Sequence, residues 1–142
     1  MTKDDMKALR STLFLVLCKD GADGRPGFDW TLYLVNAGDV SLEDVTVDSG
    51  GFSSFDDELV TTSTAHKALG TVPAGGGVAV EANDAGDFDF VVGYTVRTRR
   101  DGVALEGTFS RSSRVLGDPE PRIAALGGRQ GVVLRGTWKE MA

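Results

Sequence analysis

The segment TVRTRRDGVALEG, residues 95–107, holds the strongest indication of the fold. Asp101-Gly102 is a pair typical of the two-residue type I′ turn of a β-hairpin, because both central positions of that turn need a positive φ. A turn at this pair sets the register of the two flanking strands. Arg97 then lies opposite Glu106, an opposite-charge pair worth about 0.2 to 1 kcal/mol. The segment therefore predicts an antiparallel hairpin.

The same register sorts apolar and polar side chains onto separate faces. On one face Tyr94 lies opposite Phe109, and Val96 lies opposite Gly107. The rest of the chain also alternates with a period of two between turns rich in Gly, Asp and Pro, and it has no long helical periodicity. These patterns predict an all-β protein, a two-sheet antiparallel β-sandwich with about eight strands.

The length of 142 residues is typical of one domain, so we expect a single domain over residues 1–142. Within it, residues 1–11 are expected to be a flexible N-terminal segment. Residues 115–131 are expected to be a loop or a short helical turn before the last strand at 132–138. The strand expected at 12–18 is apolar on both faces, which indicates a central position in its sheet.

Two further local predictions concern the middle of the chain. The apolar pattern changes phase between Leu42 and Val45, which predicts a β-bulge there. The segment 48–64, DSGGFSSFDDELVTTST, has the least regular pattern, so we expect an edge or a loop that crosses between the sheets.

The formal charge of −6 is distributed unevenly along the chain. Residues 1–90 hold 6 Lys or Arg against 16 Asp or Glu, and residues 91–142 hold 9 against 5. Either acidic and basic strands become neighbours and screen each other, or the polarity docks an anionic partner or stacks copies head to tail. A sequence pI of about 4.7 and the small number of aromatics between the arginines argue against nucleic-acid binding.

Two stretches carry a family resemblance: LYLVNAGDVSLEDVTVD at 32–48 and LGTVPAGGGVAVEA at 69–82. Here the chain resembles bacterial immunoglobulin-like and fibronectin type III-like sandwich domains over about Phe28 to Phe109. The resemblance implies an immunoglobulin-like sandwich and a binding or spacer module, and no functional residue is carried over. The chain departs from antibody-type domains because Cys18 is its only cysteine, which excludes an inter-sheet disulfide within the chain.

Three groups of residues are candidates for a site. Arginines of the basic half could contact a partner, and aromatics could stack a ligand. No cofactor is expected, with calcium bound by acids near a turn as the alternative. The interaction candidates are Arg99, Arg100, Arg111 and Arg114, the stacking candidates are Trp30, Tyr33 and Trp138, and the metal candidates are Asp84, Asp87 and Asp89.

Catalysis finds little support in the sequence. His66 is the only histidine, and no G-x-S-x-G elbow or phosphate-binding loop is present. The apolar run Leu13–Cys18 is shorter than that of a signal peptide and no stretch is long enough to span a membrane, so we expect a cytoplasmic protein, with export as the alternative.

The leading hypothesis is a non-enzymatic interaction or self-assembly module for a protein partner or its own copy, without contact to nucleic acid or membrane. The alternative is a domain that binds carbohydrate or a small ligand, and a metal- or histidine-dependent hydrolase ranks last.

Overall fold

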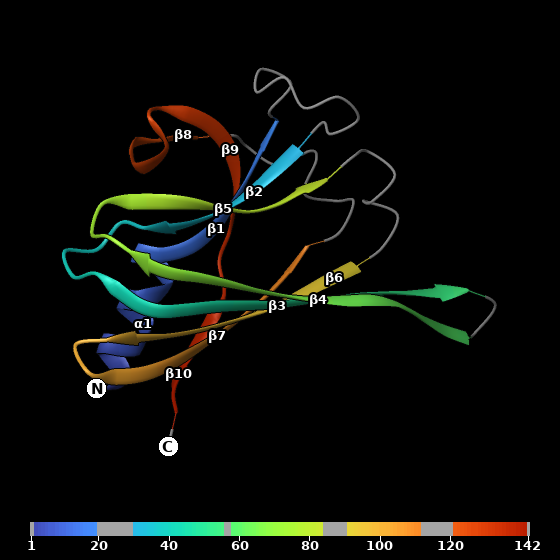
Figure 1. Cartoon of the computed structure of the whole chain (residues 1–142), viewed down its shortest axis with the longest axis horizontal. Coiled ribbons are helices and arrows are strands. Elements are labelled where there is room, and N and C mark those ends of the chain that lie inside the picture. The colour runs from blue at the N-terminus through green and yellow to red at the C-terminus, as the bar shows by residue number, and fades with distance from the viewer. Residues whose placement is uncertain (1, 20–29, 56–57, 84–90, 112–120, 142) are drawn as a thin grey trace.

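The computed structural model describes residues 2–19, 30–55, 58–83, 91–111 and 121–141. Two antiparallel five-stranded sheets form a sandwich, with strand orders β5-β2-β1-β9-β8 and β10-β7-β6-β3-β4 (Figure 1). The elements are α1 (Lys3–Thr12), β1 (Leu13–Lys19), β2 (Trp30–Asn36), β3 (Leu42–Phe55), β4 (Glu58–Val72), β5 (Gly76–Asn83), β6 (Val91–Arg100), β7 (Val103–Arg111), β8 (Arg122–Ile123), the 3-10 turn η4 (Ala124–Leu126), β9 (Arg129–Leu134) and β10 (Thr137–Glu140). The predicted all-β, two-sheet sandwich is confirmed, with more strands than the expected eight.

The β6–β7 hairpin has the register that its turn predicts. Asp101 and Gly102 have φ values of 52° and 75°, as a type I′ turn requires. Tyr94 pairs with Phe109 and Arg97 pairs with Glu106. This hairpin forms the middle of one sheet, which we call sheet B; the sheet that contains β1 is sheet A.

The core lies between the two sheets and consists mainly of Leu, Val and aromatic side chains. β1 pairs with β2 on one side and β9 on the other, so the strand predicted to be central is central. Its alternate residues Leu13, Leu15 and Leu17 face the main core, while Phe14 and Val16 belong to a second cluster on the outer side of sheet A. Both faces are buried, which explains the continuous apolar sequence.

The turn and bulge near the start of β3 are also confirmed. The buried Asn36 side chain accepts a hydrogen bond from Gly38 N at 3.1 Å and donates to Val40 O at 2.8 Å, which closes the turn. The register shifts between Leu42 and Val45, and Asp44 between them has a φ of 52°.

The segment 48–64 is not a loop that crosses between the sheets, so that alternative was wrong. The other alternative, an edge, holds for its second part, because β4 is the edge strand of sheet B. β3 and β4 continue through it as a hairpin, paired from Phe52↔Thr61 to Phe55↔Glu58. The last pairing of β3 with β6 is Phe52↔Val91, so beyond it the described part of the hairpin projects from the sandwich as two strands (Figure 1).

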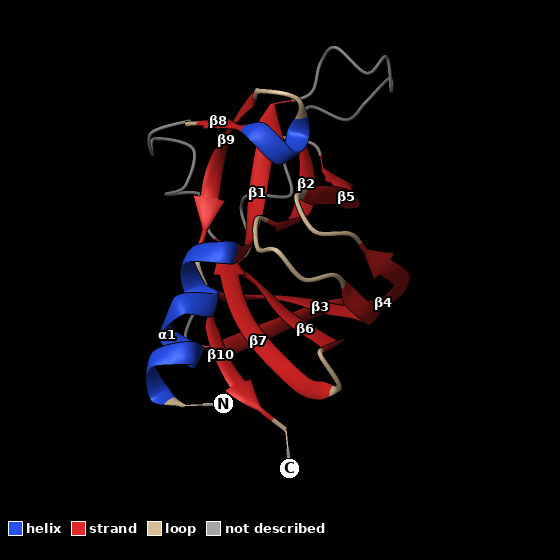
Figure 2. Cartoon of the chain, turned by 90° about the vertical axis from the view of Figure 1, so that its left-hand side faces the viewer, coloured by secondary structure: helices blue, strands red, loops and turns tan. Residues whose placement is uncertain are grey.

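Both ends of the chain also differ from expectation. Most of the segment 1–11, predicted to be flexible, belongs to α1, which spans Lys3–Thr12 and lies beside β10 (Figure 2). The last strand is two strands: β9 lies in sheet A and β10 in sheet B. Val132, Leu134 and Trp138 are all buried, so the predicted face was right, but the chain changes sheets between them. The short helical turn expected within 115–131 is present as η4, together with β8 and the start of β9.

Candidate functional site

The helix α1 presents its basic residues on one side. The Thr2 side chain accepts a hydrogen bond from Asp5 N at 3.1 Å, and Asp5 accepts one from Thr2 N at 3.0 Å, a capping box that fixes the first turn. Leu9 anchors the helix in the core at 2% exposure. Lys3, Lys7 and Arg10 are spaced four and three residues apart, which places them on one face of the helix, and all three are exposed.

Arg135 joins this basic group from the other end of the chain. Its Nη1 donates a hydrogen bond to Arg10 O at 2.8 Å, and its guanidinium lies 5.3 Å from the centre of the Phe14 ring. Its position depends on Gly136, where the chain passes from sheet A to sheet B. A Cβ at Gly136 would lie 2.5 Å from a Phe109 ring carbon and 2.7 Å from Thr108 O, so the close approach admits only glycine without a shift.

A small hollow lies between α1 and β10. It has a volume of about 160 Å³ and is lined by Met6, Lys7, Arg10, Gly136, Thr137 and Trp138. The apolar side chains of Met6 and Trp138 therefore adjoin two cations. This combination can contact an acidic group and a neighbouring apolar group of the same ligand.

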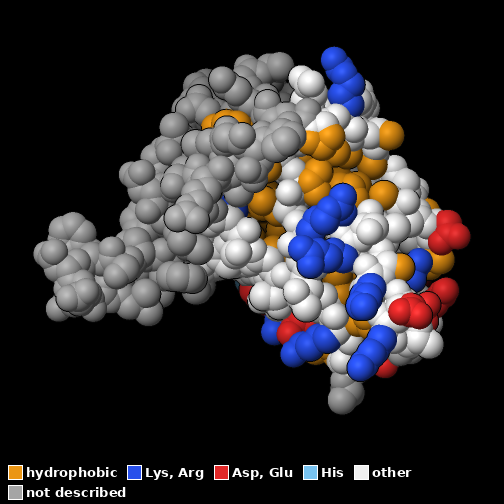
Figure 3. Space-filling model, turned by 180° about the vertical axis from the view of Figure 1, so that it is seen from behind, with side chains coloured by type: hydrophobic (Ala, Val, Ile, Leu, Met, Phe, Trp, Pro, Cys, Tyr) orange, Lys and Arg blue, Asp and Glu red, His pale blue; other side chains and the backbone are white. Residues whose placement is uncertain are grey.

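We call Lys3, Lys7, Arg10 and Arg135 the cationic face. None of the four forms an ion pair with any residue in the described ranges. Seen from behind, Lys and Arg side chains gather beside hydrophobic ones (Figure 3). Of the two acids of α1, Asp5 is held by the capping box and lines a separate cavity with Arg100, and Asp4 forms no ion pair within the described ranges.

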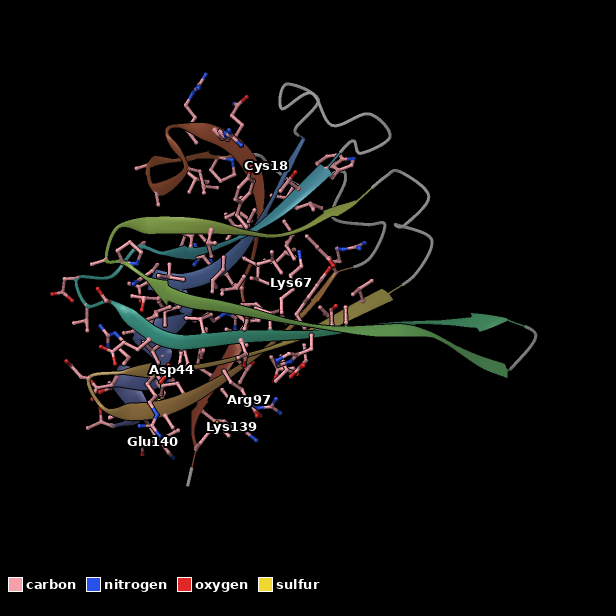
Figure 4. All side chains as sticks on the ribbon, in the orientation of Figure 1. Cys18, Asp44, Lys67, Arg97, Lys139 and Glu140 are labelled. Carbon is pink, nitrogen blue, oxygen red and sulfur yellow. The ribbon has the colours of Figure 1, made fainter. Side chains whose placement is uncertain are left out.

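The outer face of sheet B has the opposite arrangement. Arg97 on β6 donates to Asp48 on β3 at 2.8 Å and to Glu106 on β7 at 3.0 Å, and Lys139 on β10 lies 3.1 Å from Glu106. His66 on β4 hydrogen-bonds the other oxygen of Asp48. Figure 4 shows Arg97 and Lys139 near each other on this side of the sheet. These five residues, which we call the charge ladder, cross all five strands and alternate in sign when His66 is protonated.

The ladder changes the acidity of its two carboxyl groups. The hydrogen bond with His66, followed by the charges of His66 and Arg97, lowers the pKa of Asp48 from its ordinary value. The hydrogen bond with Lys139, assisted by Arg97, lowers the pKa of Glu106. Both carboxylates are therefore stabilised in their charged form, and the cations beside them are already neutralised.

His66 and Asp48 also line an open hollow of about 560 Å³ on sheet B. The hollow exists because Gly50 and Gly93, paired across β3 and β6, have no side chains. A histidine held by a carboxylate is part of a nucleophilic site, but it needs a hydroxyl or thiol within hydrogen-bond reach. Within the described ranges His66 has only the bond to Asp48, and Cys18 is buried in sheet A.

The four predicted interaction arginines have different surroundings. Arg99 is exposed, opposite Ala104 and Glu43 in the neighbouring strands. Arg100 is mostly buried, with Nη2 3.8 Å from Asp39 and with a buried Nε that has no hydrogen-bond partner among the described residues. Arg114 lies outside the described residues. The structure does not bring the three described ones, Arg99, Arg100 and Arg111, together as one exposed surface.

Arg111 was predicted to be an interaction residue, and this was wrong because its side chain is buried between the sheets. Its Nε donates to Tyr94 Oη at 2.8 Å, its Nη2 lies 3.8 Å from Glu81, and the Tyr94 hydroxyl donates to Glu81. Glu81 is on β5 of sheet A, so the three residues link the sheets. Burial and the charge of Glu81 raise the pKa of Tyr94 above its ordinary value, so the phenol stays neutral.

Two of the three stacking candidates are buried, which corrects that prediction. Trp138 is 6% exposed, donates to Leu13 O at 3.2 Å and packs edge-on against Phe109 with ring centres 5.7 Å apart. Tyr33 is buried in the outer cluster, where its hydroxyl accepts from Arg129, whose guanidinium lies 5.6 Å from the ring centre. Trp30 is half-buried.

The metal candidates Asp84, Asp87 and Asp89 lie outside the described residues. Among the described ones, no group of three or more His, Cys, Asp or Glu is placed to hold a metal ion. In the same part of the chain, no helix has the length and apolar character needed to cross a membrane.

The cationic face was missed because residues 1–11 were expected to be flexible. Two signals could have found the helix: Asp5 three residues after Thr2, as in a capping box, and the spacing of Lys3, Lys7 and Arg10. The approach of Arg135 depends on tertiary packing, and no local pattern indicates it.

The chain was also compared with known proteins. No protein-family model, no curated protein and no solved structure matches it. The resemblance to immunoglobulin-like and fibronectin type III-like domains therefore stays a prediction.

Proposed function

We propose that this protein is a non-enzymatic interaction module that binds an acidic segment of a protein through the cationic face. The observation that supports it best is the contrast in pairing: the cations of the charge ladder have acid partners, and those of the cationic face have none within the described ranges. Unpaired cations on one surface attract an anionic partner and speed its association.

The shape of the site favours a peptide segment over a long polyanion. The cationic face has four basic residues beside a hollow of about 160 Å³ that Met6 and Trp138 line, so it matches a few acids followed by one apolar side chain. The net charge of −6 repels nucleic acid at longer range, and the aromatic rings beside the cations, Phe14 and Trp138, are buried and so cannot stack bases.

Fluorescence anisotropy tests this function with a labelled synthetic peptide of alternating Glu and Asp that contains one Phe. We expect binding that weakens as salt is added, because exposed charges are screened within about 10 Å at 0.1 M ionic strength. The double variant Lys7→Glu/Arg10→Glu is expected to lower the affinity more than about tenfold, because it places like charges against the peptide.

Two controls make the result specific. The control variant Arg99→Glu/Arg122→Glu reverses two cations outside the cationic face, so it has the same net charge as Lys7→Glu/Arg10→Glu. It is expected to bind the peptide nearly as well as the wild type. Equal losses in the two double variants would contradict the assignment of the cationic face. Tighter binding of a single-stranded RNA oligomer or of anionic phospholipid vesicles than of the peptide would contradict the acidic protein segment as the ligand.

A further inference from the structure

The projecting β3–β4 hairpin and the cationic face lie at opposite ends of the molecule. Figure 1 shows the hairpin extending along the longest axis on the side away from α1. Beyond Phe52↔Val91 the hairpin has no pairing to β6, and its strands remain paired with each other up to Phe55↔Glu58. A two-stranded ribbon has little stability by itself in water, so a projecting one is suited to be covered by a partner.

The sequence at the end of this hairpin is strongly acidic. Residues 55–59 read Phe-Asp-Asp-Glu-Leu, three consecutive acids with an apolar residue on each side, and no Lys or Arg occurs from Pro26 to His66. This is the composition that the cationic face and its hollow would accept: acids for the basic side chains and an apolar residue for the space beside Met6 and Trp138.

We propose that the occupant of the cationic face is the 55–59 segment of a second copy of this chain. This inference rests on the proposed function and names its partner. The two surfaces cannot meet within one copy, because they lie at opposite ends of the long axis (Figure 1). A contact between different surfaces of two copies is heterologous, and it leaves a free hairpin on one copy and a free cationic face on the other. The copies therefore associate head to tail, in open chains, or in rings where the rotation between copies closes.

A charge-swap experiment tests the contact by sedimentation velocity on the full chain. At low salt the wild type is expected to show a mean sedimentation coefficient that rises continuously with protein concentration, and at high salt the monomer value. Lys7→Glu/Arg10→Glu changes the charge of the cationic face from +4 to zero, and Asp56→Lys/Asp57→Lys changes that of the segment 55–59 from −3 to +1. Each variant alone is expected to remain monomeric, because the attraction between its two surfaces is then lost.

The mixture of the two variants is the decisive sample. The first variant keeps the acidic segment 55–59 and the second keeps the cationic face, so an equimolar mixture restores one attractive contact and is expected to associate again. Circular dichroism and thermal unfolding of each variant establish that both are folded. A mixture that remains monomeric, or single variants that associate as the wild type does, overturns the proposed contact.

The result is separable from the test of the proposed function. A wild type that stays monomeric at every concentration while it binds the acidic peptide overturns the second copy as the occupant, and the proposed function stands. A wild type that neither associates nor binds the peptide overturns both.

Discussion

The charge ladder and the cationic face are built from the same kinds of side chain and differ in what surrounds them. In the ladder, Arg97 has two acid partners at 2.8 and 3.0 Å, and Lys139 has one at 3.1 Å. In the cationic face, Lys7 and Arg10 have none within the described ranges, and Arg135 bonds a backbone carbonyl instead. The ladder uses its cations to hold strands together, while the cationic face leaves them available to a partner.

Arg111 adds a third environment, in which the cation is buried and paired. Its side chain is 2% exposed, against 46% for Arg97. The comparison therefore predicts that stability falls most when Arg111 is replaced, less for Arg97 and least for Lys7. Of these three, only the replacement of Lys7 is expected to weaken binding of the acidic peptide.

The largest effect on stability is expected for Arg111→Met, which keeps most of the apolar length and removes the charge. Glu81 and the Tyr94 hydroxyl then lose the guanidinium group that lies beside both of them between the sheets. This loss is expected to lower the free energy of unfolding by about 3 kcal/mol. Urea denaturation measures the change. A loss below about 1 kcal/mol would show that the network contributes little to joining the sheets.

The next effect is expected at Gly136, the joint between Arg135 and the ladder strand β10. Gly136→Ala forces its Cβ against Phe109 and Thr108 O, and is expected to cost about 2 kcal/mol through overpacking. The matched control is Gly93→Ala, where the nearest atoms lie at 3.9 and 4.0 Å and alanine fits. Urea denaturation of both variants gives the two changes in the free energy of unfolding. Equal losses of stability in the two variants would contradict the close approach at Gly136.

A smaller, pH-dependent effect is expected for Arg97→Met in the ladder. The pKa values of Asp48 and Glu106 are lowered in the folded state, so their contribution is present above the unfolded carboxyl pKa and is lost as the pH falls through the lowered folded values. At neutral pH the variant is expected to lower Tm by a few degrees at most. Below the lowered pKa values the difference from the wild type is expected to vanish, and a difference that grows toward acid pH would contradict the ladder.

The smallest effect on stability is expected for Lys7→Met. Since Lys7 has no ion pair with a described residue, the free energy of unfolding is expected to stay within about 0.5 kcal/mol of the wild type. Peptide affinity is expected to fall, which separates this variant from Arg97→Met. A clear loss of stability without a change in binding would mean that Lys7 has a structural role.

Much of the fold follows from local sequence patterns. The β6–β7 register could be predicted because the Asp101-Gly102 turn and the Arg97–Glu106 pair are local and agree with each other. The central position of β1 was also predictable, because a strand buried on both faces has a continuous apolar sequence.

The parts that were missed depend on contacts between distant residues. The apolar stripe of α1 is short: Leu9 is buried, and Met6, one turn before it, is partly buried against the core. Trp138 keeps the same face as Leu134 although the chain changes sheets at Gly136, so periodicity alone cannot reveal the change. Arg111 is the last residue of β7, a position where the sequence suggests an exposed side chain. It is buried because Glu81 of the other sheet lies beside it. For the same reason the candidate site, which joins residues 3–10 to Arg135, could not be predicted.

The most direct test of the account is a two-dimensional amide NMR titration of the wild type with the acidic peptide. We predict that the shift changes concentrate on α1 and on residues 135–138, that they disappear at high salt, and that the amides of Arg97 and Glu106 in the ladder do not move. Shift changes centred on the ladder, or spread evenly over both regions, would contradict the claim that unpaired cations mark the binding surface.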